Sequence, residues 1–242
     1  MMKISIVIPA FNEEKLLPAT LASVNAACHA FERRGWATEV VVCDNNSTDR
    51  TREVALANGA RVVFEPVNQI GRARNSGAAA ATGDWLVFVD ADSQPCDGLF
   101  AAVAERIESG KVLAGGALIR LDESTRLIAA LAKVWECWSR AMRHMAGSFI
   151  FCEAAAFRSI GGFSNAFFAG EELDLSRRLK RLARERRLRI EIIAQPRLLT
   201  SARKTRLYTP REMLGFMLRA AFRPKRVLAS REACSIWYDG RR

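Results

Sequence analysis

The chain is poor in the residues that build metal cages and disulfide frameworks. It has two histidines among its 242 residues, and they lie far apart, which argues against a histidine-based metal site. Its six cysteines are scattered, with neither a C-x-x-C pair nor the spacing of metal ligands. We therefore expect free thiols in a reducing compartment.

Long apolar runs are also missing. No stretch approaches the roughly 20 apolar residues that a membrane-spanning helix needs. The opening MMKISIVIPAF is a short β-branched run that Pro9 and polar residues interrupt at once, which is not the pattern of a signal peptide. These features predict a cytoplasmic protein, either soluble or peripheral on the inner face of a membrane.

The net charge of +11 is concentrated in the last quarter of the chain. Residues 1–176 hold 17 Lys and Arg against 21 Asp and Glu, whereas residues 177–242 hold 20 against 5. A basic C-terminal face is therefore favoured over a coat that binds nucleic acid. Few aromatic residues alternate with these arginines, so we expect no nucleic-acid partner.

Apolar and helical stretches alternate through the first half of the chain. We expect strands near residues 3–9, 38–43, 61–64 and 85–89, with helices near 13–34, 50–58 and 70–82 between them. Nearly continuous apolar strands separated by helices predict an α/β fold, in which a mostly parallel sheet has helices on both faces. Ligands bind such sheets at the carboxyl ends of the strands, where polar clusters lie at 9–14, 44–49 and 90–92.

The pattern changes after residue 95. Helices are expected near residues 97–109, 124–145 and 170–185, and strands near 112–121 and 188–193. Residues 148–158 are compact and apolar, and Gly161-Gly162-Phe163 is expected to form a turn. We find no internal repeat, low-complexity segment or long linker, which favours a single domain.

Two carboxylates follow the buried strand at residues 85–89. Because side chains alternate along a strand, Asp90 and Asp92 should point to the same side. A D-x-D sequence is most often a solvated turn or a helix cap, but its place at a strand end favours a ligand site. Two carboxylates suit Mg²⁺ or Mn²⁺, which fill their remaining positions with phosphate and water.

Four stretches of the chain, in this order, resemble the motifs of family 2 glycosyltransferases of the GT-A fold: SIVIPAFNEE, VVVCDNNSTDRT, GRARNSGAAAATGDWLVFVDADS and GGFSNAFFAGEELDLSRRL. The resemblance covers roughly residues 3–200. It implies a Rossmann-like catalytic domain at 1–200, with a nucleotide-sugar-binding half at 1–95 and an acceptor half at 96–200. A basic helical tail at 201–242 would follow.

The resemblance also implies an activity. Members of the family transfer a sugar from a nucleotide-diphosphate donor to an acceptor, usually with inversion. For this chain it implies an inverting transferase that needs Mn²⁺ or Mg²⁺, with a UDP-sugar favoured as donor. The acceptor would be a sugar, a lipid-linked molecule or a small molecule, in glycan or glycolipid synthesis.

Donor-binding roles are carried over from the family to matching positions of this sequence. Asp92 would be the direct metal ligand, and Asp90 would contact the ribose or the metal indirectly. Asp44 would accept a hydrogen bond from the N3–H of uracil, a contact that suits a carboxylate. The remaining implied donor contacts are the backbones of Pro9 and Ala10, the ribose or base contact of Glu13, and the phosphate or base contact of Arg74.

The resemblance assigns Glu172 as the catalytic base that removes the acceptor proton. Glu171 and Asp174 would support it, and Arg203 or Lys204 would neutralise the diphosphate, because residues 195–206 lack the histidine that many relatives have there. Helix capping and the helix dipole offer an alternative explanation for acids at helix starts, including Glu13 and Glu172.

The motifs depart from the family pattern at three places. Residues 44–47 are D-N-N-S rather than D-D-G-S, which weakens the inference about the base. Residues 171–174 are E-E-L-D where the family has E-D-x-D, and Glu153 and Ala154 stand where an arginine is common. A degenerate domain that binds nucleotide or membrane without turnover is therefore an alternative.

Two further alternatives concern the ends of the chain. A sugar nucleotidyltransferase would carry a glycine-rich basic loop after the first strand, whereas residues 9–13 are acidic and lack it. Residues 211–226 combine an apolar helical face with basic residues, so they would either lie in a membrane interface or pack on the catalytic domain.

Overall fold

The computed structural model describes residues 1–122, 142–145, 147–203 and 227–234, together with Ser139, Gly215 and Tyr238. Its strands are β1 (Lys3–Ala10), β2 (Ala37–Asp44), β3 (Arg61–Phe64), β4 (Trp85–Val89), β5 (Ser93–Gln94), β6 (Val112–Leu121), β7 (Phe149–Glu153) and β8 (Arg189–Thr200). Its helices are α1 (Leu17–Glu32), α2 (Thr51–Ala57), α3 (Ile70–Ala80), α4 (Asp97–Glu108), α6 (Ala154–Ser159) and α7 (Glu171–Glu185).

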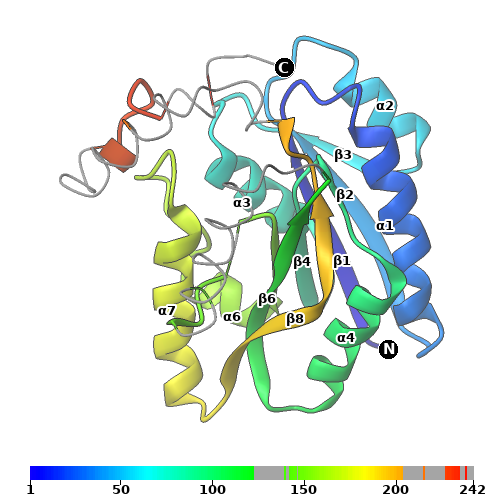
Figure 1. Ribbon diagram of the computed structural model, residues 1–242, viewed down its shortest axis with the longest axis vertical. Coiled ribbons are helices and arrows are strands. Elements are labelled where there is room, and N and C mark those ends of the chain that lie inside the picture. Colours follow the sequence, from blue (N-terminus) through cyan, green and yellow to red (C-terminus); the bar gives the residue numbers. More distant parts are fainter. Residues whose placement is uncertain are drawn as a thin grey trace.

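The strands form one mixed sheet in the order β3-β2-β1-β4-β7-β6-β8-β5 (Figure 1). Strands β1 to β4 pair in parallel, as the alternation of strands and helices predicts. β7 then pairs antiparallel with both β4 and β6, while β6 and β8 are parallel. The expectation of a mostly parallel sheet is therefore confirmed for the first half, and the second half is mixed.

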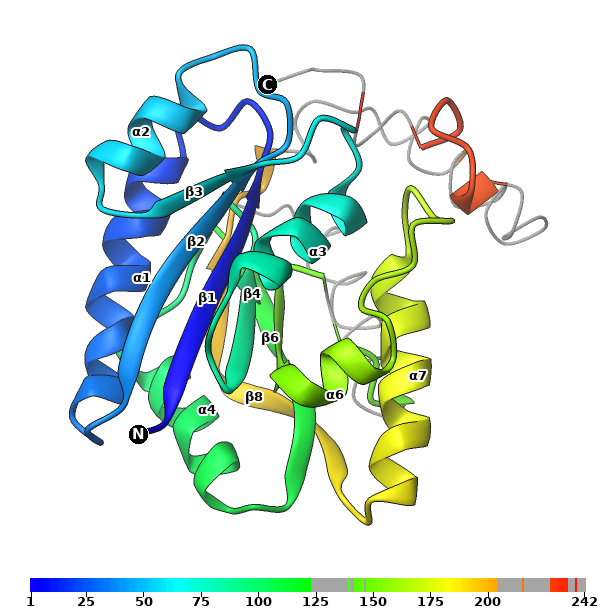
Figure 2. The same cartoon turned by 180° about the vertical axis from the view of Figure 1, so that it is seen from behind.

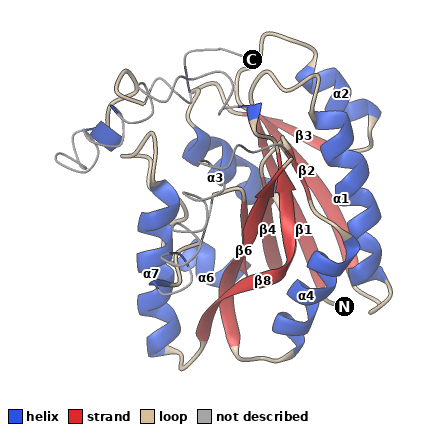
Figure 3. Cartoon of the chain, in the orientation of Figure 1, coloured by secondary structure: helices blue, strands red, loops and turns tan. Residues whose placement is uncertain are grey.

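Helices cover both faces of the sheet, as Figures 2 and 3 show. Alternation along β1 sends Ile4, Ile6 and Ile8 into the core beneath α1 and α4, and Val7 into the core on the opposite side. The second core also holds Phe88 and apolar residues of α6 and α7. Burying each such side chain contributes roughly 2 kcal/mol, so both layers stabilise the sheet that carries the strand ends.

Two elements differ in length from what the sequence predicts. α1 begins at Leu17 rather than near residue 13, because Pro18 occupies the first turn, where a missing N–H costs nothing. β8 extends to Thr200 rather than ending near residue 193, because it pairs with β6 along most of its length and then with β5. The helix expected at 124–145 lies largely outside the described residues.

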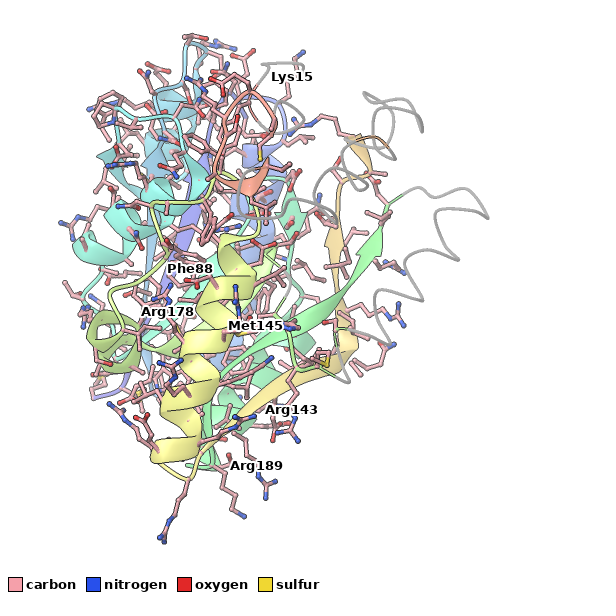
Figure 4. All side chains as sticks on the ribbon, turned by 90° about the vertical axis from the view of Figure 1, so that its left-hand side faces the viewer. Lys15, Phe88, Arg143, Met145, Arg178 and Arg189 are labelled. Carbon is pink, nitrogen blue, oxygen red and sulfur yellow. The ribbon has the colours of Figure 1, made fainter. Side chains whose placement is uncertain are left out.

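Charge is sorted along α7, the helix that faces the viewer in Figure 4. Its first turn carries Glu171, Glu172 and Asp174, and arginines dominate the rest of the helix. Acids at the positive end and bases at the negative end both stabilise a helix. Leu175 and Leu179 form its buried stripe. Within the described residues, no helix has the length and apolar character needed to cross a membrane.

Candidate active site

Polar side chains gather where β1, β2 and β4 end. Parallel pairing places Ala10, the last residue of β1, beside Asp44, the last residue of β2. The space at this edge, which we call the strand-end cleft, holds about 570 Å³ of empty volume, including the part open to solvent. Its walls are formed by Pro9, Ala10, Phe11, Glu13, Asn45, Asn68, Ile70, Asp90, Ala91, Asp92, Arg203 and Tyr238.

A second space, the α7 pocket, adjoins this cleft and holds about 490 Å³. Its walls are formed by Ile70, Arg74, Asp90, Gly147, Ser148, Phe168, Ala169, Gly170, Glu171 and Glu172. The two spaces share Ile70 and Asp90. A molecule in the cleft and another in the pocket would therefore meet at Asp90.

Arg203 closes the strand-end cleft from the end of β8. Its guanidinium donates to both carboxylate oxygens of Glu13, at 2.6 and 2.9 Å, and lies 3.8 Å from Asp92 Oδ2. Burial alone would lower the pKa of Arg203, but the hydrogen bonds and the charge of Glu13 outweigh it and raise the pKa. A permanently charged guanidinium therefore lies beside the carboxylates of the cleft.

Arg74 lines the α7 pocket and joins the carboxylates of the two spaces. Its side chain is 2% exposed, and it donates to Asp90 Oδ1 at 2.8 Å and to Glu171 Oε1 at 2.7 Å. It also donates to the carbonyl of Gly147 at 2.9 Å. These three hydrogen bonds of Arg74 go to other residues that line the pocket, and the direct contact with phosphate or base that the resemblance implied stays a prediction.

Glu171 is buried at the start of α7. Burial, and next the charge of Glu172, raises the pKa of Glu171 to about 8, although Arg74 opposes the shift. Glu172 lies beside it and lines the α7 pocket. A Cβ on Gly147 would lie 3.3 Å from Arg74 Nη2, which is tighter than an ordinary contact, so the glycine leaves room for the guanidinium here.

Two predicted residues lie outside the walls of both spaces. Asp44 is buried, and its Oδ1 accepts a hydrogen bond from the N–H of Ser47 at 3.0 Å, as a turn-capping residue does. Asp174 pairs with Arg178 at 2.7 Å, and Arg178 also donates to the carbonyl of Ile160. Arg178 therefore ties α7 to the residue that follows α6, and Asp174 holds Arg178, while the uracil contact of Asp44 stays a prediction.

The carboxylates of Asp90 and Asp92 suit a divalent cation. Both line the cleft, with 18% and 12% of their side chains exposed. In the part of the chain that the structure describes, no three His, Cys, Asp or Glu side chains are grouped to hold a metal by themselves. The donor set therefore fits Mg²⁺ or Mn²⁺ only if phosphate and water supply the other ligands, which is common for these ions.

Several wall residues were not predicted from the sequence. Asn45 could have been found, because it follows Asp44 in a polar strand-end cluster. It holds the adjoining loop by donating to the carbonyls of Glu65 and Val67. Tyr238 had no such signal, because it reaches the cleft from the far end of the chain.

The model of the family named Glycosyl transferase family 2 matches residues 5–161, which include both strand-end carboxylates. The chain belongs to glycosyl transferase family 2. Among curated relatives, a glycosyltransferase of Mycobacterium tuberculosis (strain ATCC 25618 / H37Rv) is 36% identical over 113 residues, or 47% of each chain. The chain thus spans about half the length of this relative.

Two solved structures have a similar fold. Mycobacterium tuberculosis glucosyl-3-phosphoglycerate synthase, in complex with Mn²⁺, UDP-glucose and phosphoglyceric acid, matches with a TM-score of 0.63 and 22% identity, over 97% of this chain and 80% of that one. Residues 1–349 of S. aureus TarS match with a TM-score of 0.63 and 18% identity, over 98% of this chain and 69% of that one. The expected GT-A fold is confirmed.

Proposed function

We propose that this family 2 protein is a metal-dependent inverting glycosyltransferase that moves a sugar from a nucleotide-diphosphate donor to an acceptor hydroxyl. The observation that carries the proposal is the junction of the two spaces at Asp90. Carboxylates suited to a cation line the cleft, and Glu172 lines the adjoining pocket. This arrangement provides separate places for a donor and an acceptor on either side of the bond to be exchanged.

The strand-end cleft is the proposed donor site. Asp92 and Asp90 would hold the cation, and a bound cation would offset the charge on the diphosphate leaving group. The backbone atoms of Pro9 and Ala10 would contact the nucleotide. Arg203 adds a fixed positive charge 3.8 Å from Asp92, where it can stabilise the same leaving group.

The α7 pocket is the proposed acceptor site. The acceptor oxygen would form a bond to the anomeric carbon while the bond from that carbon to the diphosphate oxygen breaks. Glu172 would take the proton of the acceptor hydroxyl. Arg74 holds Asp90 and Glu171 with one guanidinium, and thereby fixes the base-bearing end of α7 relative to the donor carboxylates.

The relatives support a UDP-sugar as donor and Mn²⁺ as cation. The mycobacterial synthase was crystallised with UDP-glucose, Mn²⁺ and phosphoglyceric acid together. For this chain we propose a sugar, lipid-linked or small-molecule acceptor and a cytoplasmic location. Residues 211–226, for which a membrane contact is predicted, lie outside the described residues apart from Gly215.

Calorimetry tests the donor site directly. We expect UDP to bind in the presence of Mn²⁺, and we expect GDP, CDP and dTDP to bind more weakly. Asp92→Ala should abolish Mn²⁺-dependent binding, whereas Asp97→Ala, which removes an exposed carboxylate paired with Arg33, should leave it unchanged. Tighter binding of another nucleotide would refute the uracil assignment but keep the site.

An assay of nucleotide-sugar hydrolysis and transfer, run beside the calorimetry, separates catalysis from binding alone. If UDP binding depends on Asp92 but no nucleotide sugar is ever hydrolysed or transferred, the degenerate binding domain is the correct interpretation. If no nucleotide binds at all, the transferase and the nucleotide-binding form of the degenerate domain both fail, and only the membrane-binding form is left.

A further inference from the structure

The C-terminal segment, by which we mean residues 227–234 and Tyr238, lies at the junction of the two proposed substrate sites. The N–H of Phe168 donates to the carbonyl of Leu228 at 2.6 Å. Leu228 also packs against Gly170, where an added Cβ would lie 3.3 Å from its Cδ1. Cys234 is fully buried, with its thiol directed at the carbonyl of Val227 at 3.3 Å. Residues 227–234 therefore pack against the loop that leads into α7.

Tyr238 extends this contact across the junction. Its hydroxyl donates to the carbonyl of Phe168 at 2.8 Å and accepts from the N–H of Ile70 at 3.3 Å. Its ring meets that of Phe168 edge to face, with centroids 5.6 Å apart. Ile70 begins α3, which carries Arg74, and Phe168 lies four residues before Glu172. One hydroxyl group thus bridges the donor half and the acceptor half.

The chemistry of the phenol suits this bridge. Burial raises the pKa of Tyr238, so the hydroxyl stays protonated and can donate and accept at once. Gln69 reinforces the link, since its side-chain amide donates to the carbonyls of Asn165 and Phe167 at 2.9 and 2.7 Å. The start of α3 therefore holds the loop before α7 through two side chains from distant parts of the sequence.

We infer that Tyr238 is a positioning residue of the transferase, whose hydroxyl holds the loop before Glu172 in register with the donor carboxylates. The inference rests on the proposed function for its catalytic consequence. It makes the C-terminal segment part of the catalytic unit, although the family match ends at residue 161.

Tyr238→Phe isolates the hydroxyl, because the ring and its contact with Phe168 remain. Ser230→Ala is the matched control, since it removes a hydroxyl of the same segment whose hydrogen bonds among the described residues are local, to Glu232 and Ala233. In the full-length protein we measure hydrogen–deuterium exchange of residues 165–172. We expect about fivefold faster exchange in Tyr238→Phe, the effect of one lost hydrogen bond, and no change in Ser230→Ala.

Kinetics test the catalytic part separately. The donor is the fastest-hydrolysed of UDP-glucose, UDP-galactose and UDP-N-acetylglucosamine, with Mn²⁺ present. Tyr238→Phe should lower kcat for UDP release by about tenfold, because misplacement of a reacting group slows the chemical step, while KM and the Kd for UDP stay near the wild-type values. A purely structural hydroxyl would lower the melting temperature and leave kcat unchanged.

Each outcome decides a different claim. Unchanged exchange in Tyr238→Phe refutes the bridge, and faster exchange with an unchanged kcat refutes the positioning role. A raised Kd for UDP with unchanged kcat would make Tyr238 a nucleotide contact instead, and would also overturn the inference. If the wild type neither binds nor hydrolyses any UDP-sugar, the proposed function fails, while the exchange measurement still decides whether the bridge exists.

Discussion

Glu171→Gln should flatten the dependence of stability on pH. Burial raises the pKa of Glu171 from its ordinary value of 4.5 to about 8. Between these two values the folded protein holds a proton that the unfolded chain has released. The free energy of unfolding therefore falls as the pH rises through this window. One proton corresponds to a slope of about 1.4 kcal/mol per pH unit.

The glutamine side chain cannot titrate, yet its oxygen can accept the hydrogen bond that Arg74 Nη1 donates to Glu171 at 2.7 Å. The variant should thus lose the slope that Glu171 contributes without losing the contact. The assay is urea unfolding, followed by circular dichroism, at several pH values across the window. Titrating groups distant from Glu171 contribute equally to both proteins, so the difference between the two slopes reports Glu171 together with the carboxylates whose charge acts on it, Glu172 and Asp90.

Glu105→Gln is the control for removing a carboxylate, because Glu105 is an exposed residue of α4. Its free energy of unfolding should change with pH in the same way as that of the wild type. If Glu171→Gln also runs parallel to the wild type, Glu171 is ionised throughout the window. Arg74 would then compensate fully for the burial of the carboxylate, and our reasoning about this network would be wrong.

Two other substitutions test the site and the sheet. Glu172→Gln should lower kcat about 10²- to 10⁴-fold, because the acceptor proton loses its base, while calorimetry should show unchanged UDP binding; a variant with normal turnover would exclude Glu172 as the base. Gly115→Ala should lower the free energy of unfolding by about 1–3 kcal/mol, because the new Cβ would clash with the backbone carbonyl oxygen of Glu191. Gly215→Ala, whose Cβ would meet no atom of the described residues within 4 Å, should unfold in urea like the wild type or slightly later, and equal loss in both variants would contradict the packing argument.

The local sequence was enough to predict the first half of the fold. Strand and helix signals in residues 1–95 are strong, and each parallel strand returns through its own helix, so β1 to β4 appear within a few residues of their expected positions. The pairing of β7 could not be predicted, because the direction of a strand in a sheet depends on where its connection crosses the molecule. The extra length of β8 has the same cause, since its second half is ordered by pairing with β6 and β5.

The candidate site also has one part that the local sequence predicts and another part that it does not. β4 ends at Val89, so Asp90 and Asp92 lie in the turn after the strand rather than on it, yet both line the cleft, as their place at the strand end predicts. The ion pair of Arg203 with Glu13 joins residues that are 190 positions apart. No local sequence pattern predicts an ion pair between residues so far apart.

The sequence by itself determined the family, the parallel core and the carboxylates at its edge, because these depend on short-range periodicity and on motifs within single loops. Tertiary structure alone decided that Arg74 lies behind Asp90 and Glu171 rather than open to the cleft, and that Tyr238 bridges Ile70 and Phe168. Those arrangements depend on which groups each buried charge and hydroxyl can pair or hydrogen-bond with in the folded chain. Distant segments must meet before such partners exist.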